Sequence, residues 1–170
     1  MQIHYRLRGL AAGLAATLAA ATAPAAEPDG PAAAPKAAET PVYRPVTSDL
    51  MNAFIQPRHI KLWLAGKNGN WDYAEYERHN IGGALARMAA AILVYKDQRT
   101  ANLIAAFATP QLADLRIAIK AKDAATFRTA YGALTTGCNQ CHQTTNHEMV
   151  VVRVPDRDPF PDQEFAAPHG

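Results

Sequence analysis

The two cysteines of the chain lie in one five-residue run, Cys138-Asn139-Gln140-Cys141-His142. Two thiols at this spacing can each add to a vinyl group of a haem, and the imidazole that follows can bind the iron from the proximal side. We therefore expect one covalently attached haem c, held by thioether bonds to Cys138 and Cys141, with His142 as the proximal iron ligand.

Three other kinds of site use cysteines at this spacing. A redox-active dithiol usually lies near a βαβ pattern, which this sequence does not show. A structural zinc site normally has four Cys or His ligands at paired spacings, and only half of such a set is present. A disulfide between Cys138 and Cys141 would close a very small ring and leave His142 unexplained. The haem interpretation is favoured over these alternatives, because it uses both cysteines and the histidine directly after them.

The N-terminal residues 1–25 have the pattern of a secretory signal peptide. Arg6 and Arg8 precede an apolar stretch over residues 9–20, and the small residues Ala23-Pro24-Ala25 follow it. The apolar stretch is shorter than the ~20 residues of a membrane span. We expect export to the periplasm with cleavage near Ala25, and an uncleaved anchor is the alternative. Export also fits the motif, because thioether bonds would consume thiols that otherwise oxidise.

Removal of the signal segment abolishes the net positive charge. The whole chain has 17 basic and 15 acidic residues, for a net charge of +2, and both basic residues of the segment are arginines. The mature chain is therefore formally neutral. It also has no basic patch interleaved with aromatic residues, so we expect no binding to nucleic acid. Paired carboxylates and a nucleophile–base pair are not apparent either, and we expect no enzymatic activity.

The remaining chain divides into three parts. Residues 26–46 are rich in proline and alanine and predict a semi-extended spacer. Residues 47–143 are expected to be helical, with short breaks. Residues 144–170 carry β-branched residues and then Asp-Pro and Phe-Pro pairs, so we expect an extended tail that lies along the helices or covers a haem edge. A loose terminus is the alternative.

Capping and breaking residues divide the helical part into four helices. Ser48, Asn70 and Asp123 are expected N-caps, and Thr109-Pro110 is expected to break the third helix with Thr109 as a fresh N-cap. Pro57 is expected to kink the first helix, because it removes a backbone hydrogen bond. The expected helices cover residues 48–65 (with Gly66 as the stop and Gly69 in the turn), 71–96, 101–121 and a last one from 124 into the motif.

Two helices show an apolar stripe that steps by four, three, four and three residues, the period of one helical face. The first stripe is Ile81, Leu85, Met88, Ile92 and Tyr95, and the second is Phe127, Tyr131, Leu134, Cys138 and Cys141. The cysteines thus continue a core-facing stripe. We predict an all-α, up-down-up-down four-helix bundle with the haem inside it, near the C-terminal end of helix four.

A haem motif at the end of the fourth helix of such a bundle resembles the class II c-type cytochromes, which include cytochromes c′ and the low-spin c-556 type. Gly137 and the motif that follows it carry the resemblance, together with the helix order over about residues 47–143. The chain departs from this family in two ways, the proline-rich spacer and the tail beyond His142. In the family, the sixth iron ligand separates electron carriers, which have a methionine from early in helix one, from five-coordinate members that bind small gases.

Met51 is the candidate distal ligand, because it lies about one turn into the first helix. His59 is the fallback, two turns further along the same face, and simple core packing of Met51 is the alternative to ligation. We expect Met88 to pack in the core and His79 to be solvated. The other two candidates, His147 and Met149, reach the distal side only if the tail folds around the haem edge.

Arg58 and the Gly82-Gly83 pair can each be explained either by a bound haem or by ordinary protein structure. Arg58 can pair with a haem propionate, or it can be an ordinary surface arginine. Gly82-Gly83 lies within the second helix, where glycine is costly, and indicates either a close approach of another helix or a ligand, or a local kink.

These expectations add up to a periplasmic single-electron carrier that exchanges electrons with redox partner proteins. The alternative function is a five-coordinate haem protein that senses or scavenges nitric oxide or carbon monoxide. A third class is a bundle in which haem mainly stabilises the fold. A homodimer through the first two helices is an open alternative to a monomer.

Overall fold

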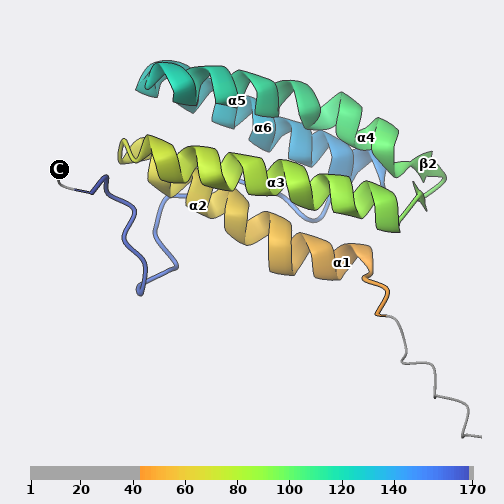
Figure 1. The fold of residues 1–170 in the computed structure, drawn as a ribbon. Coiled ribbons are helices and arrows are strands. Elements are labelled where there is room, and N and C mark those ends of the chain that lie inside the picture. The colour runs from red at the N-terminus through yellow and green to blue at the C-terminus, as the bar shows by residue number, and fades with distance from the viewer. Residues whose placement is uncertain (1–42, 169–170) are drawn as a thin grey trace, which may run out of the picture. The chain divides into compact units, whose positions relative to one another are not determined.

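The computed structural model describes residues 43–168, and helices dominate them (Figure 1). The predicted signal segment 1–25 and most of the spacer 26–46 lie outside the described residues. The expectation of an all-α protein is confirmed, since the strands within residues 43–168 form only a two-residue ladder. None of the helices among the described residues is both long and apolar enough to cross a membrane.

The first helical stretch is continuous but contains a wider turn. It comprises α1 (Thr47–Leu50), the π-helical η1 (Met51–Ile55) and α2 (Gln56–Lys67). Val46 is the N-cap instead of Ser48, and it makes no side-chain capping bond. The helix does not stop at Gly66 as predicted but ends at Lys67. Gly69 lies in the turn, as predicted, and takes the left-handed conformation (φ 74°).

Pro57 explains the wider turn. A proline in an α-helix lacks the N–H that the preceding turn would use, and its ring collides with the carbonyl four residues before it. The π-helical turn ends at Ile55, two residues before Pro57, so the stretch is widened where the proline cannot donate to the preceding turn. The proline thus reshapes the residues before it, and this π-helical turn begins with Met51.

Helix α3 (Trp71–Ala91) begins as predicted, with the Asn70 side chain accepting a hydrogen bond from the Tyr73 N–H. It ends five residues earlier than the predicted 71–96, because the chain turns into a hairpin of β1 (Val94–Tyr95) and β2 (Gln98–Arg99). Both residues of the turn have positive φ, 48° for Lys96 and 61° for Asp97, as a tight two-residue hairpin requires. Neither is a glycine or asparagine, so the usual sequence signal was missing.

The third predicted helix is indeed divided at Thr109-Pro110, into α4 (Thr100–Phe107) and α5 (Thr109–Ala121). Its N-cap is Ala108 instead of Thr109, whose hydroxyl donates back to the Ile104 carbonyl. Helix α6 (Ala124–Thr144) contains the whole cysteine motif. Its N-terminus is capped as predicted, with the Asp123 carboxylate accepting from the N–H groups of Ala125 and Thr126.

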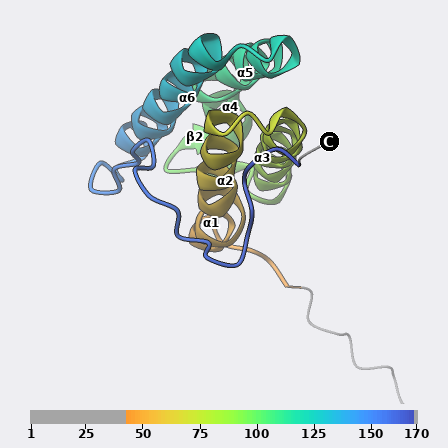
Figure 2. The same cartoon turned by 90° about the vertical axis from the view of Figure 1, so that its left-hand side faces the viewer.

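The helices pack side by side in the order α2, α3, α5 and α6, with α4 against α3 and α6, and successive stretches run in opposite directions (Figures 1 and 2). Helices α2 and α6 are also in contact, which closes the arrangement. The start of α1, the end of α3, the start of α4 and the end of α6 therefore lie at the same end. The motif in α6 is positioned at this end, as the short connections predict.

Two glycines allow helices to approach closely, and neither belongs to the Gly82-Gly83 pair. A methyl group added at Gly66 would overlap the ring of Phe127, and one added at Gly137 would overlap the Phe107 carbonyl of α4. At Gly82 the nearest such contact is Leu112 at 4.0 Å, which is ordinary packing. Gly137 therefore sets the distance between α6 and α4 immediately before the cysteines.

Residues 146–168, which we call the C-terminal strap, have no regular secondary structure but pack against the helices. From the end of α6 the strap crosses to the opposite end of the helices (Figure 1). There Phe165 is buried and stacks on Tyr73 of α3. The Asn70 side chain donates to the carbonyl of Ala166 at 2.9 Å. Within the described residues the strap therefore lies along the helices and is anchored at its far end.

Candidate cofactor site

A cavity of about 560 Å³ lies at the end of the helices that contains the motif. This volume is within the range of about 300–1,000 Å³ that is typical of small-molecule and cofactor sites. Apolar side chains from several elements line it, and they include Ile55, Ile60, Ile81, Leu85, Leu103, Ile104, Phe107 and Leu134. Residues of the strap from Val150 to Arg157 also line the cavity. The cavity is therefore bounded by helices and by an extended segment.

All three motif side chains line this cavity. Cys138, Cys141 and His142 occupy the last turns of α6, where residues three and four apart share one face. Both cysteines are free thiols. Burial, with a smaller contribution from Cys141, raises the pKa of Cys138 to about 11, and burial also raises the pKa of Cys141. Thiols with raised pKa values are poor redox nucleophiles, so this environment does not favour the redox-dithiol interpretation.

His142 has a hydrogen bond that fixes its tautomer. Its Nδ1 lies 2.7 Å from the carbonyl oxygen of Val150 in the strap. A carbonyl can only accept a hydrogen bond, so Nδ1 carries the proton and Nε2 retains its lone pair. Histidines that bind metals almost always donate their other ring N–H in this way. The structure thus presents His142 in the form that a metal ligand needs.

Met51, the candidate distal ligand, lines the same cavity and is half-buried. It is the first residue of the π-helical turn η1, and such turns are frequent at functional sites. Met88 of α3 also lines the cavity, but it is almost fully buried in the core, as predicted. The structure thus brings two thioether sulfurs to the lining, and Met51 is the more accessible.

His59, the fallback ligand, lines the cavity but has both ring nitrogens engaged. Its Nε2 lies 3.0 Å from the Thr135 Oγ1, and its Nδ1 lies 2.8 Å from the Tyr131 hydroxyl. The Thr135 hydroxyl also lies 3.0 Å from the Tyr131 carbonyl, and the Tyr131 hydroxyl lies 2.8 Å from the His59 carbonyl. In the neutral ring one nitrogen donates to its hydroxyl partner and the other nitrogen accepts from its own. Burial lowers the pKa of His59 to about 4. His59 is therefore a neutral bridge between α2 and α6 in this arrangement, with no nitrogen free for iron.

The remaining histidines and Met149 are placed as follows. His79 is exposed, as expected, and Met149 is exposed as well. His147 lines the cavity, with Nδ1 donating to the Thr145 carbonyl at 2.6 Å and Nε2 accepting from the Tyr95 hydroxyl at 2.9 Å. Both nitrogens of His147 are thus occupied, and its role is to tie the start of the strap to the hairpin.

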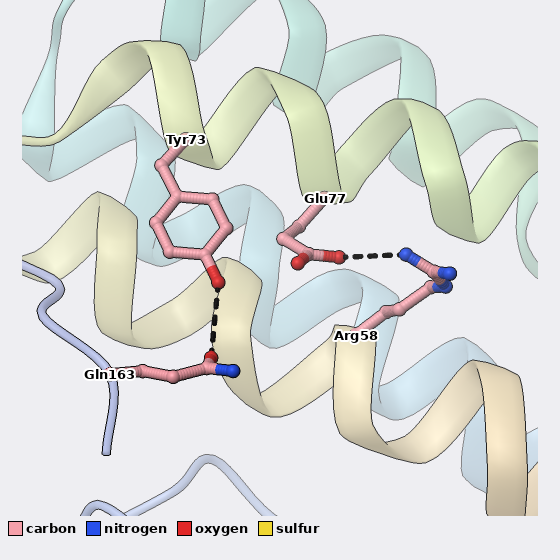
Figure 3. A network of polar contacts seen from close by, with 4 residues as sticks. All are labelled: Arg58, Tyr73, Glu77 and Gln163. Carbon is pink, nitrogen blue, oxygen red and sulfur yellow. Dashed lines mark hydrogen bonds and ion pairs between the residues drawn. The ribbon is translucent and has the colours of Figure 1, made fainter. Parts of the chain in front are cut away.

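Arg58 pairs with a carboxylate of another helix and does not line the cavity. Its Nη1 pairs with the Glu77 carboxylate of α3 at 3.3 Å, in a contact that joins α2 to α3 next to the hydrogen bond between Tyr73 and Gln163 of the strap (Figure 3). Burial raises the pKa of Glu77, and the Arg58 charge opposes that rise. Arg58 is not among the lining residues, so the suggestion that it binds a propionate is not supported.

The strap instead supplies the cationic side chains of the described lining. Arg153 and Arg157 line the cavity, with Asp156 as the acidic residue between them. Neither arginine belongs to the motif or to an expected helix, and neither was predicted to be a site residue. The available signal was the β-branched run before them, which predicted extended chain but not where that chain would lie.

One buried polar atom on the cavity wall has no partner. The Thr100 side chain is fully buried, and its Oγ1 makes no hydrogen bond within the described part of the chain. Thr100 is the first residue of α4 and lines the cavity. A buried hydroxyl without a partner is costly, so a water molecule or a bound group at the cavity wall would complete its hydrogen bonding.

Comparisons with known protein families, with curated proteins and with solved structures find no match for this chain. Among residues 43–168, no three His, Cys, Asp or Glu side chains cluster in a way that would hold a metal ion by themselves. The motif and the cavity geometry are therefore the observations from which a function can be inferred.

Proposed function

We propose that this chain is an exported mono-haem c-type cytochrome, a four-helix bundle of the class II kind that carries single electrons in the periplasm. The observation that carries the proposal is the joint placement of Cys138, Cys141 and His142 on the wall of one apolar cavity of about 560 Å³. The proposal assigns electron exchange with redox partner proteins and no catalytic reaction.

The residues present suit a haem in chemistry as well as in space. Cys138 and Cys141 are free thiols that can form the two thioether links, and His142 keeps Nε2 available for iron. Arg153 and Arg157 offer positive charge to the two carboxylates of the group. When bound, the haem would supply a one-electron iron couple, and the apolar lining would exclude water and favour a higher reduction potential.

Met51 is proposed as the distal ligand. It lies at the cavity end of the first helical stretch, and the other candidate on that face, His59, has both nitrogens hydrogen-bonded. A thioether ligand raises the potential of the iron and leaves no open coordination position, which suits a carrier.

The attachment is tested by intact-mass spectrometry of protein matured in a host with the haem-attachment machinery. We expect the mass of the chain cleaved near Ala25 plus one haem. The Cys138→Ser/Cys141→Ser double variant should carry no covalent haem. An apo mass for the properly matured wild-type chain would contradict the proposal.

The distal ligand is tested with a matched pair of methionine variants. Leucine has nearly the volume of methionine but cannot bind iron, so Met51→Leu should turn a low-spin spectrum into a high-spin one while Met88→Leu leaves it low-spin. An unchanged spectrum for Met51→Leu removes Met51 from the iron. A change in Met88→Leu alone would transfer the role to Met88.

A second function has one specific observation in its favour. The unpartnered Thr100 hydroxyl on the cavity wall could donate to a small gas bound at an open coordination position. A high-spin wild-type protein whose reduced spectrum changes with carbon monoxide would establish this alternative, a nitric oxide or carbon monoxide sensor or scavenger. Thr100→Val should then release the gas faster, whereas in a six-coordinate carrier it should leave the spectrum unchanged.

A further inference from the structure

The first residue between the two cysteines makes a contact that attachment chemistry does not require. The side-chain amide of Asn139 donates to the Val152 carbonyl at 2.9 Å and accepts from the Val152 N–H at 2.8 Å. The amide therefore pairs with the strap as a neighbouring β-strand would. Gln140, the other residue between the cysteines, is exposed, and its side chain has no hydrogen bond among the described contacts.

The Asn139 pairing lies two residues beyond the carbonyl that accepts from His142. Val150 is held on its other side as well, because its N–H donates to the His147 carbonyl at 2.9 Å. His147 is in turn fixed by the hydroxyl of Tyr95. The Val150 carbonyl thus lies between two anchors, and its position 2.7 Å from the His142 Nδ1 follows from both.

We infer that Asn139 is a positioning residue for the proximal ligand: it holds the strap so that the Val150 carbonyl accepts the His142 Nδ1–H. This inference rests on the proposed function, in which His142 binds iron through Nε2. An acceptor on Nδ1 makes the imidazole a stronger electron donor, which stabilises the oxidised iron. The strap therefore lowers the reduction potential and keeps the ring from rotating.

The far end of the strap is anchored independently, so the effect of Asn139 is local. Phe165 packs on Tyr73 with ring centroids 5.5 Å apart and nearly parallel planes, and Lys61 lies 4.7 Å above the ring of Phe160. Loss of the Asn139 pairing frees the strap near His142 without detaching its end. Loss of the pairing should therefore alter the surroundings of His142 and leave the stability of the whole fold nearly unchanged.

The test compares Asn139→Ala with Gln140→Ala in the haem-loaded protein. Both variants keep the two cysteines and the histidine, so both should carry covalent haem. We expect Asn139→Ala to raise the reduction potential and to speed trypsin cleavage after the exposed Arg153, while Gln140→Ala matches the wild type in both. Val152→Pro removes the N–H from which the Asn139 side chain accepts a hydrogen bond. It should reproduce the Asn139→Ala result, and it replaces that variant in the test if Asn139→Ala folds poorly.

Two outcomes overturn the inference. Equal reduction potentials for Asn139→Ala and the wild type would show that the pairing does not act on the ligand. A Gln140→Ala shift as large as that of Asn139→Ala would show a general effect of altering the motif. These results are distinct from failure of the proposed function, which would appear as a wild-type chain that leaves maturation without haem.

Discussion

The two halves of helix α6 carry one stripe of side chains but have opposite surroundings. In the first half, Phe127 and Tyr131 are fully buried among aromatic rings. In the second half, Cys138 and Cys141 are only partly covered and face the cavity. The helix period is the same in both halves, so the difference must come from the elements that face them.

Large rings fill the first end and smaller side chains line the second. Trp63 of α2 stacks on Phe127 at 6.2 Å and Trp71 of α3 meets it edge-on at 5.9 Å, while Gly66 lets α2 come close to that ring. At the cavity end, aliphatic side chains of α3 and α4 leave space, and residues of the strap close the gap. The comparison shows how the packed helices can be solid at one end and enclose a cavity at the other.

The largest expected effect lies at the aromatic end. Phe127→Ala should lower the free energy of unfolding by about 3–5 kcal/mol, because it removes a fully buried ring and leaves a cavity. Phe54→Ala is the control, since Phe54 is 42% exposed and should cost less than about 1 kcal/mol. Urea unfolding at neutral pH measures both. Similar losses for the two variants would refute the view that the aromatic end carries the stability.

A pH-dependent effect is expected at the boundary between the two halves, where His59 bonds to Tyr131 and Thr135. The pKa of His59 is lowered from 6.5 to about 4, so the unfolded chain binds a proton at a higher pH than the folded one. The stability from neutral His59 is complete above pH 6.5 and declines as pH falls towards 4, by roughly 3 kcal/mol in all.

His59→Gln, which cannot titrate, isolates this contribution. Denaturant unfolding of the mature protein at pH 7, 5.5 and 4 should show the wild type losing stability more steeply than the variant. Parallel pH profiles would mean that His59 has the same pKa in the folded and the unfolded chain, and the lowered pKa of the buried bridge would then be wrong.

The smallest expected effect sharpens the comparison within α6 itself. Gly137→Ala should destabilise by about 1–3 kcal/mol, because the new methyl group meets the Phe107 carbonyl of α4. Gly132→Ala meets nothing within 4 Å, so it should be neutral or stabilise by up to about 1 kcal/mol through helix propensity. Thermal unfolding of the pair measures the difference. Equal changes in stability for the two variants would show that α4 can move aside to accommodate the new methyl group at Gly137.

Much of the local structure was predictable because it depends on neighbours in sequence. Asn70 and Asp123 cap the helices that they were expected to cap, and the break at Thr109-Pro110 is present. Two predictions of local structure were wrong, because the residue types at these positions do not indicate the backbone conformation that they adopt. The wide turn before Pro57 replaced a simple kink, and the hairpin after α3 uses Lys96 and Asp97 in a conformation that those residue types rarely signal.

The sequence by itself determined the chemistry on offer and the helical face that presents it. The spacing of Cys138, Cys141 and His142, and the period of the stripe that leads to them, need no knowledge of the rest of the chain.

Only the tertiary structure decided which hydrogen-bond and ion-pair partners the polar side chains around the motif have. Arg58 is paired with Glu77, both nitrogens of His59 are occupied, and the strap lies on Asn139 and His142. Each of these contacts joins separate parts of the fold. Their formation depends on how the helices pack and where the strap crosses them, and no local pattern contains that information.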